Sequence, residues 1–446
     1  MTDKKQVFEQ LFDGNIPSRV PININVGFEA CVSYLNADLR QLQWNMQEFE
    51  PVCEKFCKIL YSDVVPVMPS VRLPAMYHFL GSQSFIPAEN GYMQHPEVVG
   101  MQDDEYDELI EDPYACIMRK VLPRQFKSLG GDDPVMSAIA LYQAMTANAQ
   151  DMNAFMGILG KMNQKYGYFT APPNSSRSTE APFDYLADQL RSFSGISKDI
   201  RRKRDKIPAA CEALYEFAFR RGLPGNISNY GQSFLPLHMP PFMREKDFAD
   251  LWWPTFIRLI EHYASMGLHA KLFCEQDWTR YADYLAELPA DTILWFEYGD
   301  AKLLKEKLGE KHILTGFYPL TAVKNKSEKE CIDLAKEYID ILAPGGKYIF
   351  GFDKIPVSAG DVNMKTLCKL SEFIRDYAVY ENAGQKNKIS LDPSAYQTPE
   401  YRKIESAYFP SFDAYSQKYP TLPQCARAKY DGLNETLYQF LLGLIY

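Results

Sequence analysis

The sequence predicts an α/β protein of the (β/α)8 TIM-barrel class, with an insertion near the barrel mouth and a C-terminal extension. Residues 226–380 alternate short apolar runs with amphipathic segments through five successive strand–helix units, and a similar alternation begins the chain. The 446 residues, of which 46% are hydrophobic and 24% charged, provide ample material for a core. Because such barrels accept long insertions, we expect one domain, residues 1–446.

Two strands are expected near the start of the chain. Residues 20–27, VPININVG, alternate apolar residues with asparagines, so Asn23 and Asn25 share one face. Residues 63–68, DVVPVM, form the second expected strand. Helices are expected before and between them, at residues 3–12 and 47–60. The order strand, helix, strand indicates a parallel sheet.

Residues 72–131 break the alternation with aromatic-rich turns and the acidic stretch MQDDEYDELIED. A long irregular segment in a compact domain is often functional, so we expect an insertion or lid here. His78 and His95 lie in it and are expected to be surface or structural residues. A Met-rich helix is expected at residues 134–166, with its methionines filling the core.

The later elements follow in order from the same patterns. We expect a turn at residues 173–177. The expected helices before the regular units span 184–193 and 207–222. Strands are then expected at 226–238, 269–275, 291–298, 312–318 and 347–353, and helices at 246–266, 278–288, 301–308, 327–342 and 362–380.

The C-terminal extension, residues 384–446, is rich in Tyr, Pro and Lys and ends in an apolar run. It is expected to cover the exterior of the barrel or a partner subunit. The sequence is compatible with a homodimer and does not choose between these two arrangements.

Charge and composition exclude several classes of function. The net charge of −9 argues against nucleic acid or an anionic membrane as the main partner. No stretch reaches the ~18 apolar residues of a membrane span, and the N-terminus lacks a signal-peptide pattern, so we expect a cytoplasmic protein. The nine cysteines are scattered without a CxxC pair, which indicates neither a disulfide framework nor a zinc ribbon.

Three late motifs carry a family resemblance. They are TGFYP at 315–319, APGGKYIF at 343–350 and DYAVY at 376–380. Together they resemble the uroporphyrinogen decarboxylase superfamily, which includes porphyrinogen decarboxylases and zinc-dependent, corrinoid-linked methyltransferases. Where a true decarboxylase carries an arginine-rich segment after its first strand, this chain has NVGFE at 25–29. A substrate with many carboxylates would find few bidentate partners there.

The methyltransferase branch is the closer resemblance, with departures. In its thiol-methylating members, the strand matching 272–275 ends in His-x-Cys, and a second Cys follows the late Gly-Gly strand. Phe273 and Glu275 occupy the first motif here, and the second Cys position falls near Asp353. The soft ligands that suit a thiolate substrate are therefore absent. Since alternate strand residues point to opposite faces, Glu275 shares a face with Phe273, and Cys274 is expected to be buried on the other.

Candidate site residues lie at the expected strand ends. One imidazole and carboxylates suit a zinc ion with an open position, which would activate an ether or alcohol oxygen as a leaving group. Lys354 or a tyrosine would assist as proton donor. The expected catalytic residues are Glu275, Lys354 and Asp300; the substrate-binding residues are Asn25, Phe273 and Tyr318; the metal ligands are His238, Glu275, Glu297 and Asp353.

The resemblance implies a methyltransferase that moves a methyl group between a small O-methylated or related substrate and a corrinoid. Since the chain has no cobalamin-binding motif of its own, a corrinoid-binding partner protein is implied. One alternative is a metal-independent decarboxylase of uroporphyrinogen or another carboxylated substrate. The second alternative is a non-catalytic small-molecule or corrinoid binding protein.

Overall fold

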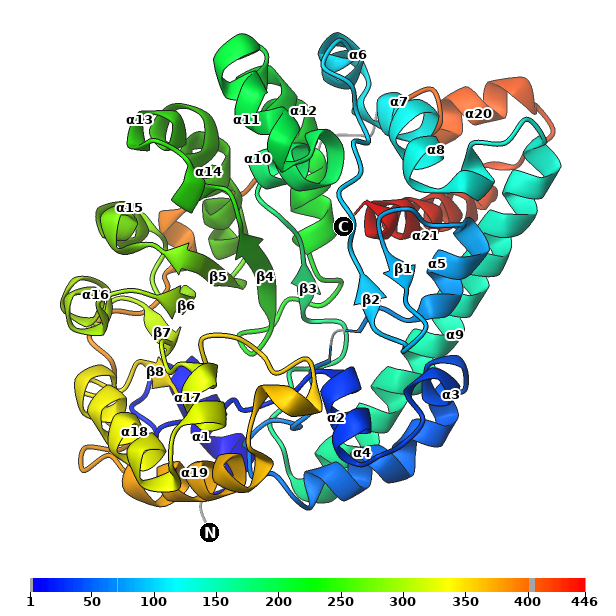
Figure 1. Cartoon of the computed structure of the whole chain (residues 1–446). Helices are drawn as coiled ribbons and strands as arrows, with labels where there is room; N and C mark the ends of the chain where they lie inside the picture. Colours follow the sequence, from blue (N-terminus) through cyan, green and yellow to red (C-terminus); the bar gives the residue numbers. More distant parts are fainter. Residues whose placement is uncertain (1–2, 70, 401–405, 446) are drawn as a thin grey trace.

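A computed structural model describes residues 3–69, 71–400 and 406–445 as a mixed α/β protein. Its main sheet has six parallel strands in the order β3-β4-β5-β6-β7-β8, so each strand lies beside its neighbour in the sequence. Figure 1 shows helices outside the sheet and the strands inside. The strands are β3 (Arg177–Ser178), β4 (Gln232–Leu237), β5 (His269–Asp277), β6 (Ile293–Tyr298), β7 (Ile313–Gly316) and β8 (Tyr348–Ile349).

The sheet has six strands rather than the expected eight. The two expected strands near the N-terminus, residues 20–27 and 63–68, take part only through single parallel bridges, such as Ile22 to Phe350. Pro21 and Pro66 interrupt both segments, and proline has no N–H to give to a ladder. Conversely, β3 is a strand that was not expected, because the sequence predicted a turn and loop there.

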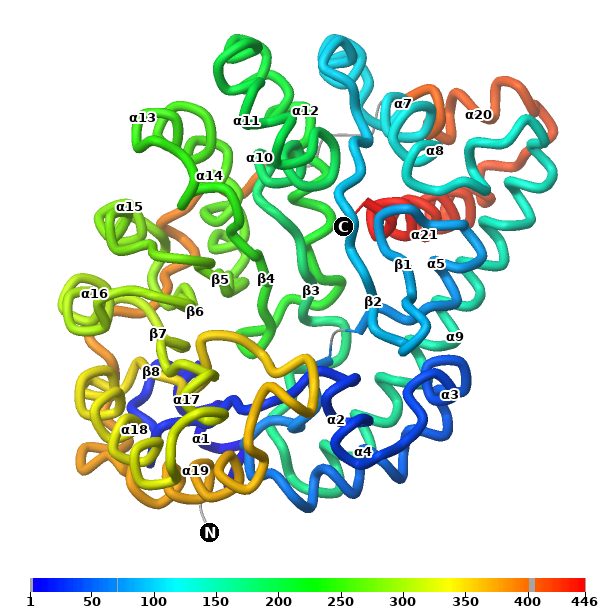
Figure 2. Tube along the Cα trace, in the orientation of Figure 1, coloured from blue at the N-terminus to red at the C-terminus, as the bar shows by residue number. Residues whose placement is uncertain are grey.

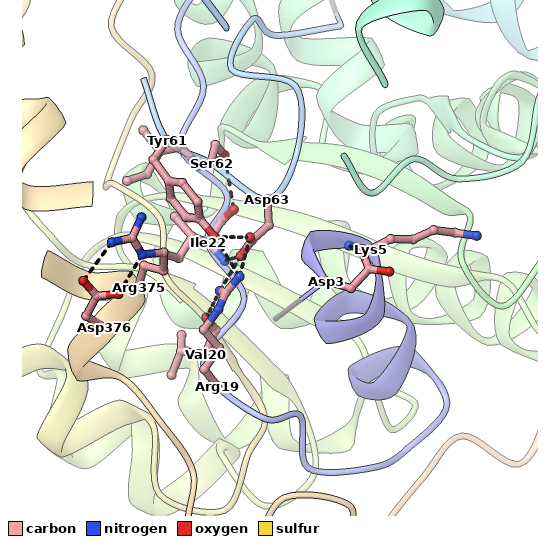
Figure 3. A network of polar contacts seen from close by, with 11 residues as sticks. Asp3, Lys5, Arg19, Val20, Ile22, Tyr61, Ser62, Asp63, Arg375 and Asp376 are labelled. Carbon is pink, nitrogen blue, oxygen red and sulfur yellow. Dashed lines mark hydrogen bonds and ion pairs between the residues drawn. The ribbon is translucent and has the colours of Figure 1, made fainter. Parts of the chain in front are cut away.

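Side chains replace the missing ladder bonds between these two segments (Figure 3). The two terminal guanidinium nitrogens of Arg19 each lie 2.6 Å from an oxygen of the Asp63 carboxylate, and both side chains are buried. Asp63 also accepts a hydrogen bond from the Ile22 N–H at 2.8 Å, and the Tyr61 hydroxyl donates to it at 3.0 Å. Asp63 therefore organises the segments that lack regular strand geometry.

Helices follow the strands in regular alternation. The observed bounds of α9, α12 and α16 match the expected ranges, whereas the expected helices at 184–193 and 246–266 contain π-helical turns at Tyr185–Arg191 and Phe248–Trp252. The α-helices outside the insertion and the C-terminal extension are α1 (Lys4–Phe12), α2 (Phe28–Tyr34), α3 (Leu39–Trp44), α4 (Glu50–Cys57), α9 (Pro134–Tyr166), α10 (Pro182–Asp184), α11 (Phe193–Arg202), α12 (Ile207–Gly222), α13 (Glu245–Asp247), α14 (Trp253–Ser265), α15 (Ala282–Glu287), α16 (Ala301–Leu308), α17 (Leu320–Asn325), α18 (Glu328–Leu342) and α19 (Met364–Tyr377).

The two faces of the sheet differ in accessibility. On β5, Ala270, Leu272 and Cys274 are buried on the outer face, toward the helices. Lys271 and Phe273 alternate with them on the inner face and are only half-buried. The same alternation runs along β4. The expected burial of Cys274 is thus observed, and the inner face is accessible.

Helix α1 closes the amino ends of the strands. Its Phe8 and Leu11 belong to a compact apolar cluster with Ile293, Ile313 and Ile349, the first inner-face residues of the later strands. This cluster covers the end of the sheet where β6 and β7 begin. The opposite end, where the strands finish, is therefore the side on which a site can open.

The insertion, residues 72–131, runs from α5 through a short hairpin to α8, as the trace in Figure 2 shows. Helix α5 packs against the long α9. Whether the insertion moves as a lid stays a prediction. Its elements are α5 (Pro74–Leu80), β1 (Ile86–Pro87), β2 (Met93–Gln94), α6 (Tyr106–Glu111), α7 (Pro113–Cys116) and α8 (Leu122–Gln125).

The described part of the C-terminal extension packs on its own chain. Helix α21 (Arg427–Leu444) contacts α12, and the hydroxyls of Tyr438 and Tyr114 share a hydrogen bond at 3.1 Å. The extension also contains α20 (Phe412–Lys418). Residues 401–405 and 446 of the extension lie outside the described residues. In the described ranges, no helix is both long and apolar enough to cross a membrane.

Helix α18 begins with a capping box, in which Ser327 and Glu330 satisfy each other's backbone N–H groups. We expect Ser327→Ala to lower the free energy of unfolding by about 1 kcal/mol, because the first turn loses its acceptor. Ser197→Ala is the control, since that exposed hydroxyl bonds only a carbonyl within its own helix. Urea titration measures both variants, and equal stabilities would contradict the role of the cap.

Candidate active site

Three strands deliver titratable side chains to one edge of the sheet. Glu180 follows the end of β3, His238 follows β4, and Glu275 lies near the end of β5. Because β4 and β5 are parallel and Leu237 pairs with Cys274, His238 comes level with Glu275. The His238 Nδ1 atom lies 2.8 Å from Glu275 Oε2. An imidazole–carboxylate pair thus stands at the carboxyl edge.

Two further carboxylates surround this pair from the segment after β3. Asp188 Oδ2 lies 4.0 Å from His238 Nε2. Asp184 is fully buried and accepts hydrogen bonds from the Trp252 indole at 2.9 Å and from the His238 backbone N–H at 3.4 Å. We call Glu180, Asp184, Asp188, His238 and Glu275 the His238 centre.

The spacing of the acids explains how one short segment supplies three of them. Glu180, Asp184 and Asp188 recur every four residues; Glu180 precedes a helical segment, and Asp184 and Asp188 lie within it. Pro182 begins that segment, and the apolar residues between the acids are buried. The sequence prediction missed these three residues, although acids recurring every four positions in an apolar run were the available signal.

Burial dominates the electrostatics of this centre. It raises the pKa of Glu180 and of Asp184, and the charge of Asp188 raises both further. Burial also raises the pKa of Asp188, against the charge of His238. In the described structure, Glu180 Oε2 and Asp188 Oδ2 have no hydrogen-bond partner. The centre therefore retains protons at a pH where ordinary carboxyl groups have lost them.

His238 is the positive charge of the centre. Burial acts to lower its pKa, but the hydrogen bond to Glu275 and the charges of Asp188 and Glu275 raise it to about 10. The ring is therefore an imidazolium at neutral pH. Because Nδ1 is bonded to Glu275 and Nε2 is beyond hydrogen-bond distance of Asp188, the Nε2–H is free to donate to a ligand.

We expect Glu180→Gln to stabilise the protein above neutral pH. The raised pKa means that the folded state binds a proton that the unfolded chain has lost, so this group's stabilisation falls as pH rises above the ordinary carboxyl pKa. Glutamine removes that dependence and should increase the free energy of unfolding at pH 8 by about 1 kcal/mol or more. Denaturant titrations at low and high pH measure the effect, with exposed Glu337→Gln as control. A loss of stability at pH 8 would contradict the claim that burial raises the pKa of the Glu180 carboxyl group.

A second cluster of polar side chains, Glu297, Asp353 and Lys354, connects the ends of β5 and β6 with the segments that follow β7 and β8. Glu297 forms an ion pair with Lys354 and accepts from the Gln276 N–H at 2.7 Å. Asp353 accepts from the N–H groups of Leu320 and Lys354, each at 2.8 Å. The Glu297 bond holds Gln276 at φ 60°, an unusual conformation for a residue other than glycine. These groups fix loop geometry at the edge of the site.

The four expected metal ligands do not gather around one point. His238 and Glu275 bond each other, whereas Glu297 and Asp353 are engaged by Lys354 and by backbone N–H groups. Across the described ranges, no group of three or more His, Cys, Asp or Glu side chains is arranged to hold a metal ion. The expected set therefore does not fit a single zinc ion.

The remaining expected site residues lie in different surroundings. Asn25 is half-buried and donates to the Asn23 side chain at 3.2 Å. Phe273 lies on the inner face, with its ring centroid 4.2 Å from that of Trp295. Tyr318 is fully buried and its hydroxyl donates to the Cys331 carbonyl, while exposed Asp300 caps α16. The structure brings Phe273 to the site but gives Tyr318 and Asp300 local structural contacts.

The insertion reaches the neighbourhood of His238. The His95 ring stacks on Phe85 at 4.2 Å, and the Arg72 guanidinium lies 4.4 Å over the same ring. Burial, together with the charges of Arg72 and His238, lowers the pKa of His95. The charge of His238 thus acts on His95, so the hairpin of the insertion lies within electrostatic range of the centre. An insertion near the barrel mouth was expected, whereas an electrostatic effect of His238 on His95 was not.

Comparisons with known proteins show the fold. No family model and no curated protein matches the chain. A methyltransferase from Methanosarcina mazei is similar in structure, with a TM-score of 0.50 and 12% sequence identity. The match covers 84% of this chain and 99% of that one. At this identity the likeness concerns the arrangement of the chain alone.

Proposed function

We propose that the protein is a methyltransferase, which moves a methyl group between a small O-methylated substrate and a corrinoid carried by a partner protein. The observation that carries the proposal is the His238 imidazolium, whose Nε2–H is free at the carboxyl edge of the sheet. The likeness to a methyltransferase supports it at the level of fold. With it we propose that residues 1–446 form one (β/α)8 barrel of the uroporphyrinogen decarboxylase type, with irregular first strands.

Proton donation is the chemistry that this centre offers. When a methyl ether loses its methyl group, the carbon–oxygen bond breaks and its electron pair stays on oxygen. The oxygen is a poor leaving group unless this charge is neutralised as it develops. In the proposal His238 gives its Nε2 proton to that oxygen, and the alcohol or phenol leaves neutral. A reduced corrinoid on the partner would supply the nucleophile that accepts the methyl group.

The carboxylates give this step its orientation and its proton supply. Glu275 accepts from Nδ1 and so fixes which ring nitrogen faces the substrate. Asp188 faces Nε2 at 4.0 Å and is placed to reprotonate it after each turnover. Since Glu180 and Asp184 also hold protons near neutral pH, the centre has several proton donors rather than one.

Zinc is not assigned a step in this proposal. The four expected ligands are engaged with one another, with Lys354 or with the backbone, so the residues present do not fit the ion as a set. The charge stabilisation that a Lewis acid would supply is instead attributed to the imidazolium. Lys354 is a further cation near the site edge, and its ion pair with Glu297 raises its pKa.

Methyl transfer to free cob(I)alamin tests the proposal. The purified protein is mixed with cob(I)alamin and a panel of aromatic and aliphatic methyl ethers, and the corrinoid spectrum is followed. We expect cob(I)alamin to convert to methylcobalamin only when both protein and a suitable ether are present. Conversion of uroporphyrinogen to coproporphyrinogen, with no ether used, would favour the decarboxylase alternative. Tight corrinoid binding without any turnover would favour the binding-protein alternative.

A further inference from the structure

A lysine lies on the inner face of the sheet, toward its amino end from the His238 centre. Lys271 is on β5, two residues before Phe273 and four before Glu275, so all three side chains share the inner face. It pairs in register with Phe234 of β4 and Ile293 of β6, neither of which is charged. The same alternation places two titratable groups on this face of β5, Glu275 after Lys271 and His269 before it. His269 is buried at the amino end of the strand, where its Nε2 atom lies 2.9 Å from the Asn229 side chain.

Lys271 has no counter-ion. Within the described part of the chain, no carboxylate lies at ion-pair distance and no acceptor at hydrogen-bond distance of its Nζ atom. The Nζ atom instead lies over the ring of Trp295, 5.1 Å from its centroid. By contrast, buried Arg19, Arg191 and Lys347 each pair with an aspartate.

This isolation has an energetic consequence. Burial lowers the pKa of Lys271 to about 8, so the side chain is still mostly an ammonium at neutral pH. Burying a charge without a partner is costly, and the cost falls when a ligand supplies the opposite charge. The ammonium is thus prepared for an anion from outside the chain.

The surroundings of the ammonium are aromatic and accessible. The ring of Trp295 lies 4.2 Å from Phe273 and 6.4 Å from Phe234, between centroids. The Trp295 indole donates to the Phe352 carbonyl at 2.8 Å, which holds the ring in place. All three aromatic side chains are only half-buried. A flat apolar ligand would find ring faces here beside a cation.

The distance along the strand sets the length of that ligand. Lys271 and Glu275 are four residues apart, which is about 13 Å between their backbone positions. His238 is level with Glu275 on the next strand. One aromatic ring with groups at opposite ends spans this separation once both side chains extend toward it.

We propose that Lys271 binds the carboxylate of a planar aromatic substrate, with the ring against Phe273 and Trp295 and the ether oxygen facing His238. This assignment rests on the proposed function, because it names the substrate class of the same site. It also explains why an unpaired ammonium is kept on an otherwise aromatic face. Methoxylated aromatic acids are then preferred over neutral ethers.

Binding of a matched pair of ligands tests the assignment without corrinoid. Calorimetry compares 4-methoxybenzoate with its neutral analogue 4-methoxybenzamide. We expect the wild type to bind the acid at least tenfold more tightly than the amide. Lys271→Met should weaken acid binding by at least tenfold and leave amide binding unchanged. Lys305→Met is the control, because burial also lowers the pKa of that lysine to about 8, yet it lies on α16 and bonds the Leu342 carbonyl.

The wild type alone gives a second readout, should Lys271→Met fail to fold. The affinity for the acid should fall as pH rises through about 8, where the ammonium is lost, while that for the amide stays constant. Equal binding of acid and amide, or acid binding that is unchanged by both pH and Lys271→Met, would overturn the assignment. If the acid binds through Lys271 but never loses its methyl group, the anion site stands and the proposed function fails. If neutral ethers are demethylated equally well by the wild type and by Lys271→Met, the proposed function stands and the anion site fails.

Discussion

Replacing His238 with glutamine lowers the rate of methyl transfer by about 10²- to 10⁴-fold, the usual contribution of a positioned general acid. Glutamine keeps a hydrogen-bonding side chain beside Glu275 but has no titratable proton for the leaving oxygen. Since the histidine is partly exposed, the fold should persist. The rate of cob(I)alamin methylation from a methyl ether at saturating donor measures the loss.

Two comparisons separate a chemical role for His238 from a structural one. The wild-type rate should fall as pH rises through about 10, where the imidazolium loses its proton, and His238→Gln should show no such fall. His78→Gln, which changes an exposed histidine on α5, should retain wild-type activity. If His238→Gln kept the wild-type rate and pH profile, His238 would not be the proton donor.

Removing the Asp63 carboxylate is expected to be the most damaging single change for stability. Asp63→Ala leaves the buried Arg19 guanidinium without its partner and removes the acceptor of the Ile22 N–H. Breaking a buried ion pair from one side costs about 3–5 kcal/mol. The free energy of unfolding from guanidinium titration should fall by this amount, and the segments at residues 20–27 and 63–68 should separate first.

The exposed pair Arg375–Asp376, which Figure 3 also shows, is the matched control. Asp376→Ala should cost less than about 1 kcal/mol, because solvent screens a surface pair. The double variant Arg19→Met with Asp63→Leu should recover part of the loss, since it leaves no unpaired charge. Equal effects of Asp63→Ala and Asp376→Ala would show that the buried pair does not organise the first segments.

Much of the architecture was predictable because local signals and packing agree. Helices such as α12 and α16 have an apolar stripe and clear termini, and their observed bounds match the expected ones. The first two strands differ because a pattern of apolar residues does not reveal which backbone groups find partners. Pro21 and Pro66 were visible in the sequence, but their effect depends on Asp63 and Ser62 taking over the hydrogen bonds.

The site was predictable only where a residue type and a strand end coincide. That reasoning selected His238 and Glu275, which the structure brings into contact. It missed Asp184 and Asp188, because they follow a strand of two residues and lie in a segment that resembles an ordinary helix. Lys271 escaped notice for a different reason: a sequence shows a lysine but not the absence of its partner.

The most direct test of the account follows one labelled methyl group through one turnover. The protein is incubated with cob(I)alamin and 4-methoxybenzoate carrying ¹³C in the methoxy group, and the products are identified by NMR. We predict labelled methylcobalamin and 4-hydroxybenzoate in equal amounts, with the carboxylate intact. Release of carbon dioxide with the label still on the ether oxygen would contradict methyl transfer and assign the His238 centre to decarboxylation.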